Sequence, residues 1–336
     1  MQVIHEGFRQ ADEFRGSPSG PGEAAVAAPS PAGLPARPRR NPFRGSTEGW
    51  LLTLPALAVL VAMTLVAGLY VFYISLYHVD NFGGGSTFVG LRNYTDAFRT
   101  YHLLGDLIRT IGFVVVAVLL ELLIGGFLAF QLAKRFRGNG FVGILMLIPF
   151  AMTPAVSAMI FRILLDPSSG WVDHYMQSWG LTSQPIQWLS NAPMAWIGLI
   201  ALDVWSWTPF VALILLAGIQ SLPREVLEAS AMDGASSWKQ LRYITLPLLT
   251  PFIAIAGVLR TIQAFKTVDS FLVLTNGGPG ESTTVANLSV YRLVVQNFDI
   301  GLGAAVAVVV LVVLLVLTPL LMRIVGRYAE HERGAS

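Results

Sequence analysis

The sequence LPREVLEASAMDGA, residues 222–235, lies between two long apolar runs and has the features of a short helix. Pro223 suits a first helical turn, where its missing N–H costs no hydrogen bond. Glu225 lies near the positive end of the helix dipole, which favours an acidic side chain. Gly234 fits the position just after a helix, where the backbone often takes a positive φ. We therefore expect a short polar helix that ends at Gly234.

A second short helix is expected directly after the first. Ser236 or Ser237 can cap its N-terminus, because a serine oxygen accepts a hydrogen bond from one of the first free N–H groups. The sequence ITLP follows at residues 244–247, and Pro247 marks the beginning of the next apolar run. The two short helices predict a polar hairpin at a membrane surface.

The apolar runs on both sides of this hairpin are long enough to cross a membrane. A hydrocarbon core about 30 Å thick needs roughly 20 mostly apolar helical residues. Six runs meet this requirement, so we predict an all-α membrane protein with six transmembrane helices. Pro149, Pro154 and Pro209 are expected to kink the spans that contain them. The six predicted spans are residues 51–77, 107–133, 141–165, 195–220, 248–272 and 301–324.

Basic residues predict the orientation, because loops rich in Lys and Arg stay in the cytoplasm. They cluster before the first span and after the second, fourth and sixth, whereas residues 166–193 contain no Lys or Arg. We therefore expect the hairpin and both termini in the cytoplasm, with the protein in a bacterial inner membrane. The basic residues after these spans are Lys134, Arg135, Arg137, Arg224, Lys239, Arg242, Arg323, Arg327 and Arg333.

The ends of the chain differ from the apolar middle. Residues 1–46 are polar and rich in Pro, Ala, Gly and Ser, a composition typical of disorder. The first apolar run is of full spanning length, which argues against a cleavable signal peptide. We expect a disordered cytoplasmic tail at 1–46, a transmembrane domain at 47–328 with its hairpin loop at 221–247, and a short C-terminal tail at 329–336.

The composition excludes several classes of function. The chain is 54% hydrophobic and 12% charged, far below the roughly 25% charge of a soluble domain. A net charge of +2 without a basic face gives no support for nucleic-acid binding. With no cysteine, disulfides and thiolate metal sites are excluded. No phosphate-binding loop, His-Glu-x-x-His or Gly-x-Ser-x-Gly pattern is present. We expect no cofactor, metal or catalytic centre, so active transport would need ATP hydrolysis on another chain.

The first predicted helix has a surface suited to contact with another protein. Ala229 and Ser230 are small enough to let a partner approach the backbone, and Glu228 and Asp233 offer ion pairs to a basic partner. On this local chemistry alone, an ordinary interfacial linker between two spans is an equally good interpretation.

A family resemblance favours the docking interpretation. Glu228-Ala-Ser, Gly234 and Ile244-x-Leu-Pro247 resemble the "EAA" signature of ABC importer permeases, an acidic-small-small triplet followed by Gly and by Ile-x-Leu-Pro. Ser230 replaces the usual second Ala and keeps the side chain small. In that family the segment is the coupling helix, which docks into a cleft of the ATPase subunit. The resemblance implies this role for residues 223–234, and ATPase docking for Glu228, Ala229, Ser230, Asp233 and Gly234.

The resemblance covers about residues 50–325 and extends to weaker motifs. VGLRNY at 89–94, Trp205 with Pro209, and LTNGGP at 274–279 look like the carbohydrate-uptake permeases of the maltose and glycerol-phosphate type. A type I importer fold is implied. The implied partners are a dimer of the ATP-binding cassette ATPase, a second and homologous permease subunit, an external solute-binding protein, membrane lipid, and a sugar or polyol as solute.

Polar residues inside the spans are the expected solute pathway, because ionisable groups in a membrane usually face a cavity or one another. On a continuous helix over 248–272, Arg260, Gln263, Lys266 and Ser270 fall within an arc of about 120°. Such a face can replace the hydration of a hydroxyl-rich solute. The predicted pathway residues are Asp203, Trp205, Arg260, Gln263, Lys266, Asp269 and Asn276.

Each of these residues also has a structural interpretation. Lys266 can pair with Asp269, and Asp203 with Arg260, to hold helices together. Trp205 can belong to the interfacial aromatic belt, and Asn276 can lie in a plain glycine-rich turn.

Two other functions compete with the importer hypothesis. A carrier driven by a proton or sodium gradient could use Glu121 or Asp269 for the coupling ion, but it leaves the hairpin signature unexplained. A lipid-processing enzyme would need a catalytic constellation that the sequence lacks.

Overall fold

The computed structural model describes residues 47–80, 85–134 and 138–333. The chain divides into two units, residues 1–59 and 60–336, and the second contains every element after the middle of the first helix. The tail expected at 1–46 lies outside the described residues. Helix α13 continues to Arg333, so helical structure extends into the expected C-terminal tail at 329–336.

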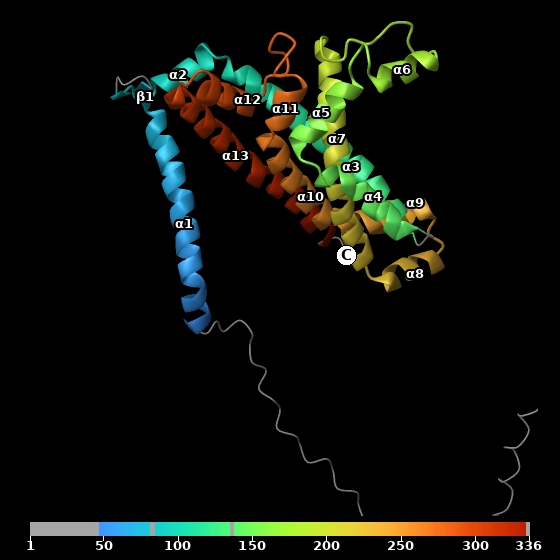
Figure 1. The fold of residues 1–336 in the computed structure, drawn as a ribbon. Coiled ribbons are helices and arrows are strands. Elements are labelled where there is room, and N and C mark those ends of the chain that lie inside the picture. The colour runs from blue at the N-terminus through green and yellow to red at the C-terminus, as the bar shows by residue number, and fades with distance from the viewer. Residues whose placement is uncertain (1–46, 81–84, 135–137, 334–336) are drawn as a thin grey trace, which may run out of the picture. The chain divides into compact units, whose positions relative to one another are not determined.

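The described residues form helices and one two-stranded antiparallel ribbon (Figure 1). Two short π-helical turns, η1 and η2, are continuous with neighbouring α-helices. The elements are α1 (Thr47–Ser75), β1 (Tyr77–Asp80), β2 (Gly85–Phe88), α2 (Arg92–Arg99), α3 (Leu103–Ala133), α4 (Asn139–Ala151), α5 (Pro154–Leu164), α6 (Trp171–Ser178), α7 (Ala192–Ser221), α8 (Arg224–Met232), α9 (Ser237–Gln240), η1 (Leu241–Thr245), α10 (Leu246–Lys266), α11 (Asp269–Leu274), α12 (Ala286–Tyr291), η2 (Arg292–Gln296) and α13 (Ile300–Arg333).

The prediction of an all-α membrane protein is confirmed. Among the described residues, five helices are long and apolar enough to cross a membrane, and a bent pair brings the number to as many as six. The five are Thr53–Ser75, Leu103–Ala133, Ala192–Ser221, Ser237–Lys266 and Ile300–Leu320.

The predicted third span, residues 141–165, is broken rather than kinked. Helices α4 and α5 meet at an angle of 95°. Pro154 begins α5, and a proline disfavours helical geometry in the residue before it. Thr153 is accordingly extended, with φ −70° and ψ 142°.

The fifth span also differs from the prediction at both ends. It begins at Ser237, because α9, η1 and α10 form one continuous helix through Pro247. The wider π-helical turn just before Pro247 accommodates a residue that cannot donate a backbone hydrogen bond. The helix ends at Lys266 and not at residue 272, and α11 begins after the extended residue Thr267. The predicted common face of Arg260 and Ser270 is therefore wrong.

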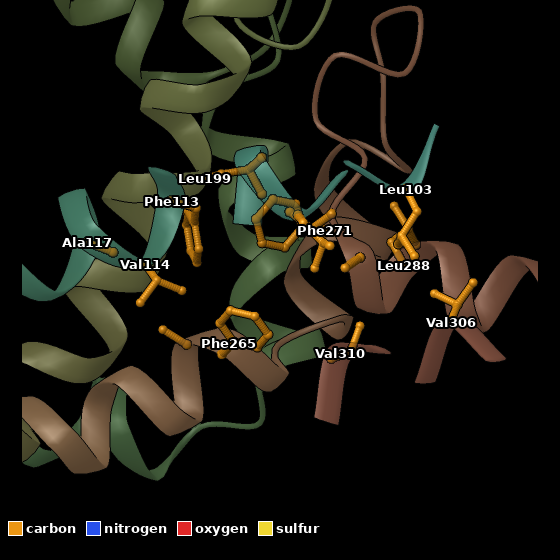
Figure 2. Packing of buried hydrophobic residues seen from close by; sticks show 14 of the residues in the cluster. Leu103, Phe113, Val114, Ala117, Leu199, Phe265, Phe271, Leu288, Val306 and Val310 are labelled. Atoms are coloured by element: carbon orange, nitrogen blue, oxygen red, sulfur yellow. The ribbon is translucent and has the colours of Figure 1, made fainter. Parts of the chain in front are cut away.

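The core of the larger unit lies between α3, α7, α10, α11, α12 and α13. Figure 2 shows Phe113, Leu199, Phe265 and Phe271 together in this cluster of buried apolar side chains. The Phe113 and Phe271 rings meet edge to face with centroids 4.9 Å apart.

Small residues let the spans approach closely, as is usual for helices packed in a membrane. A Cβ on Gly125 of α3 would lie 2.9 Å from Val211 Cγ1 and 3.2 Å from the Ala212 nitrogen of α7. Gly218 of α7 faces the Phe252 ring of α10 in the same way, with a Cβ at 2.6 Å. These contacts pack α7 closely against both α3 and α10.

Candidate functional site: a membrane-buried ion-pair network and a polar hairpin

Three charged side chains from three spans meet inside the larger unit. Arg260 of α10 donates two hydrogen bonds to the Glu121 carboxylate of α3, and its Nη2 also donates to Asp203 Oδ2 of α7 at 2.6 Å. The Arg260 and Glu121 side chains are 0% exposed and the Asp203 side chain is 3% exposed. The three ionic groups therefore join α3, α7 and α10 at one buried point.

The guanidinium of Arg260 has one further neighbour. Its Cζ lies 4.5 Å from the centroid of the Trp207 ring, within the range of a cation–π interaction. The Nη1 nitrogen of Arg260 is buried and has no hydrogen-bond partner among the described residues. The sequence predicted Arg260 and Asp203 as pathway residues but did not place Glu121 among them. The signal for Glu121 in the sequence was a single carboxylate in the middle of an apolar run.

The predicted pathway residues fall into two groups. Asp203 and Arg260 are buried and paired with each other, as the structural interpretation of the sequence allowed. Gln263, Lys266 and Asp269 are exposed on the single chain. Lys266 and Asp269 form no ion pair with any described residue, and Asp269 lies in the first turn of α11, beyond the end of the span.

The two remaining pathway residues are partly or fully exposed. Trp205 of α7 is 38% exposed, and its ring lies 5.6 Å from that of Phe161. Asn276 is exposed with a φ of 47°, and its carbonyl accepts a hydrogen bond from Arg292 Nη2 at 2.5 Å. None of the exposed residues lies in the ion-pair network.

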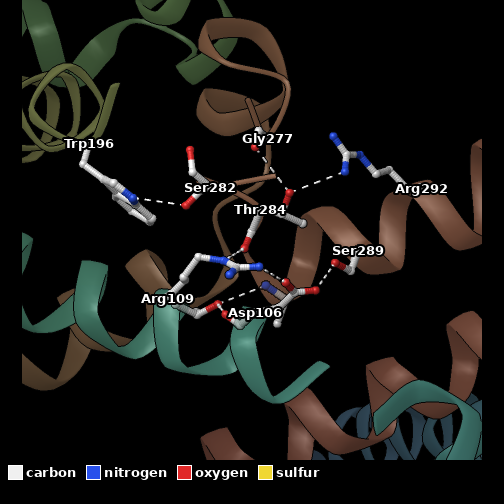
Figure 3. Close-up of polar contacts among 10 residues, drawn as sticks. Asp106, Arg109, Trp196, Gly277, Ser282, Thr284, Ser289 and Arg292 are labelled. Atoms are coloured by element: carbon white, nitrogen blue, oxygen red, sulfur yellow. Dashed lines mark hydrogen bonds and ion pairs between the residues drawn. The ribbon is translucent and has the colours of Figure 1, made fainter. Parts of the chain in front are cut away.

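The glycine-rich segment after α11 is tied to three helices. Figure 3 shows Arg109 of α3 donating to the Thr284 carbonyl at 2.9 Å and Trp196 of α7 donating to the Ser282 carbonyl at 3.2 Å. Arg292 of η2 donates to Thr284 Oγ1 at 3.4 Å. These contacts show that the segment is more than a plain loop.

Two features near this segment explain its shape. Gly277 has a φ of 77°, and a Cβ there would lie 2.6 Å from Arg292 Nη2 and 2.7 Å from Thr284 Oγ1. Arg109 is held by Asp106 at 2.7 Å, and Ser289 donates to the same carboxylate. Sequence reasoning did not single out Asp106 and Arg109, although their three-residue spacing on a helix is a sign of a pair.

The polar hairpin forms as predicted. Gly234 follows α8 with a φ of 78°, as expected, whereas Pro223 is the extended N-cap of the helix and so directly precedes the first turn in which the sequence placed it. Ser236 caps α9 by accepting from the Lys239 N–H at 3.5 Å. Figure 1 shows α8 beside α9.

The predicted docking residues are not equally accessible. Glu228, Ala229, Asp233 and Gly234 are exposed. Ser230 is only 8% exposed, because its hydroxyl is turned toward the hairpin interior. The exposed residues combine two acids with little side-chain bulk.

The part of the chain that matches a known family contains both the buried ion-pair network and the polar hairpin. Residues 121–330 match the family of the binding-protein-dependent transport system inner membrane component, a range that contains Glu121, Asp203, Arg260 and the hairpin. The chain belongs to this family. It is thus a permease component of an ABC transporter, a transport subunit without catalytic activity of its own.

Relatives of this permease match over most of their length. A probable ABC transporter permease protein y4oQ of Sinorhizobium fredii is 38% identical over 88% of this chain and 95% of its own. The trehalose/maltose transport system permease protein MalF of Thermococcus litoralis is 34% identical over 85% and 96%. The sn-glycerol-3-phosphate transport system permease protein UgpA of Escherichia coli is 32% identical over 85% and 96%.

A solved structure supports the type I permease fold. A chain of a bacterial alginate ABC transporter, in complex with an alginate pentasaccharide-bound periplasmic protein, aligns with a TM-score of 0.70 and 20% identity over 84% of this permease and 96% of that chain. Family membership implies an ATPase and a solute-binding protein as partners. It also makes the gradient-driven carrier and the lipid-processing enzyme unfavoured alternatives.

Proposed function

We propose that this permease forms half of the solute pathway in an ATP-driven importer for a sugar or polyol. The observation that carries the proposal is the exposed polar hairpin between α7 and α10, in a chain whose named relatives include trehalose/maltose and glycerol-phosphate permeases. The other half of the pathway is a second, homologous permease. An external binding protein delivers the solute.

Helix α8 is assigned the role of the coupling helix. Its exposed residues Glu228, Ala229, Asp233 and Gly234 provide two acids and a low-bulk surface for a cleft of the ATPase subunit. Closure of the ATPase pair on ATP moves α8, and the bundle switches between outward and inward access as a rigid-body transition. This assignment requires the hairpin and both termini to lie in the cytoplasm, as the basic loops predict.

The solute pathway is assigned to the exposed polar residues. Gln263 and Lys266 of α10 are exposed on the single chain and free to face a cavity shared with the second permease. We also assign Asp269, Trp205 and Asn276, which are exposed on the single chain, to the pathway. Asp203 and Arg260 are buried in their ion pair, so we assign them to holding the pathway helices in place.

Purification with the neighbouring gene products tests the assembly. Mild-detergent extraction of the tagged permease, followed by mass spectrometry and an ATPase assay, should recover an ATPase, a second permease and ATP hydrolysis that the sugar-loaded binding protein stimulates. Recovery of this chain alone, with solute uptake that follows an ion gradient, would overturn the proposal.

Loss of a pathway hydrogen bond should weaken solute handling. Gln263→Ala and Lys266→Ala should each raise the solute concentration for half-maximal transport roughly five-fold, because one hydrogen bond contributes about 1 kcal/mol. Uptake in proteoliposomes at several solute concentrations measures the change. Leu259→Ala, an exposed apolar position on the same helix, is the matched control. An effect confined to protein abundance would return both residues to a structural role.

A further inference from the structure

The polar hairpin is closed by one side chain. Gln240, the last residue of α9, donates from Nε2 to the Leu227 carbonyl of α8 at 2.8 Å and to Ser230 Oγ at 3.0 Å. Ser230 Oγ in turn donates to the Leu227 carbonyl at 2.8 Å. The amide, the hydroxyl and the carbonyl form a closed set of three hydrogen bonds, of which two join the two helices and one lies within α8.

Little else holds α8 to the following span. In the part of the chain that the structure describes, the two bonds from Gln240 are the only side-chain hydrogen bonds between α8 and the continuous helix Ser237–Lys266. Apolar packing is sparse there, since Met232 is 89% exposed and Trp238 is 66% exposed. The Gln240 amide is therefore the principal link across the hairpin.

Gln240 also lies at a decisive place on the fifth span. It directly precedes η1, and its carbonyl accepts from Thr245 Oγ1 at 3.3 Å. From there the helix continues without a break past Arg260 to Lys266. A displacement of α8 that passes through Gln240 would reach the buried ion pair and the exposed polar residues along one helix.

Ser230 and Gln240 are chemically matched. An alanine at position 230 could not take part, because a methyl group cannot accept a hydrogen bond. The serine hydroxyl here accepts the second hydrogen bond of the Gln240 amide. The serine and the glutamine together make the link.

We propose that Gln240, with Ser230 as its partner, is a positioning residue that transmits the movement of α8 to the fifth span. The proposal rests on the coupling role of α8 proposed above. If α8 moves with the ATPase, this link converts its movement into movement of α10. Without the link, α8 would still move with the ATPase, but α10 would move less.

The test separates docking from transmission. The full complex carrying Gln240→Leu, which keeps the bulk but cannot donate, is reconstituted with its binding protein. We expect unchanged recovery of the ATPase and continued ATP hydrolysis, with solute transported per ATP reduced about five-fold. Ser230→Ala should give a smaller loss in the same direction, because the Leu227 carbonyl still accepts from Gln240. Lys239→Leu, an exposed neighbour, should leave the ratio unchanged.

A distance measurement distinguishes transmission from a purely structural role in docking, because a role in docking alone would leave the distance between α8 and α10 unchanged. The chain has no cysteine, so spin labels at Met232→Cys and Leu259→Cys report only the distance between α8 and α10. Gln240→Leu should broaden the distance distribution.

Two results would overturn the proposal: an unchanged distribution width, or an unchanged transport-to-ATP ratio. If Gln240→Leu instead releases the ATPase, Gln240 serves docking and the transmission proposal fails. The coupling role of α8 fails separately if changes at Glu228 and Gly234 leave ATPase recovery and transport intact.

Discussion

Replacement of Arg260 by leucine should remove most of the folded permease from the membrane. The substitution would leave Glu121 and Asp203 buried without their cation, and removal of one partner from a buried ion pair costs about 3–5 kcal/mol. This is a large part of the stability of a typical domain. Size-exclusion profiles and the thermal midpoint of the detergent-purified protein measure the loss.

Matched variants distinguish burial of charge from simple loss of an arginine. Arg92→Leu disrupts an exposed pair with Asp96 at 3.6 Å, and such pairs contribute only about 0–1 kcal/mol. It should leave the thermal midpoint almost unchanged. The triple variant Arg260→Met, Glu121→Gln and Asp203→Asn removes all three charges and should recover part of the lost stability. A thermal midpoint of Arg260→Leu equal to that of the parent would show that the network does not stabilise the fold.

Replacement of Gly234 by valine should abolish ATP-driven uptake while the chain stays in the membrane. Gly234 has a φ of 78°, and nothing lies within 4 Å of a Cβ built there. The cost is therefore backbone strain and not a clash, of order 1–3 kcal/mol for a side chain that disfavours this region. Relief of that strain would change the backbone direction at the end of α8 and so displace the docking surface that we assign to it. Uptake in proteoliposomes and ATPase recovery during purification are the measurements.

Gly234→Asn is the control for this effect. Asparagine tolerates a positive φ far better than valine does, so this variant should keep most of the uptake although it also adds a side chain. Equal loss in both variants would indicate that the surface itself needs a glycine. Undiminished uptake in Gly234→Val would contradict the assignment of α8 as the coupling helix.

Local chemistry explains why the hairpin could be predicted closely. The stop at Gly234 and the cap at Ser236 depend on neighbouring residues of the chain. The break before Pro154 was expected only as a kink. A proline marks the place where a helix is interrupted, whereas the 95° turn is set by the packing of α4 against α7 and of α5 against α11.

The solute-pathway prediction shows the limit of helical periodicity. It placed Arg260 and Ser270 on one face because the apolar run was taken as one helix. The helix ends at Lys266, where Asn287 from α12 donates to the Phe265 carbonyl at 2.6 Å and satisfies one of its last backbone acceptors. The residues next to Phe265 in the sequence do not indicate that its carbonyl will bond to a side chain 22 positions away.

The sequence by itself determined that this protein is an all-helical membrane protein, where four of its spans lie, and that a short helix with a glycine stop separates the fourth span from the fifth. These features follow from apolar run length and from contacts between residues close in the chain. Only the tertiary structure decided that Glu121, Asp203 and Arg260 share one buried site, and that Gln240 closes the hairpin. Such partners come from separate helices, and the packing of small residues such as Gly125 and Gly218 sets which side chains meet.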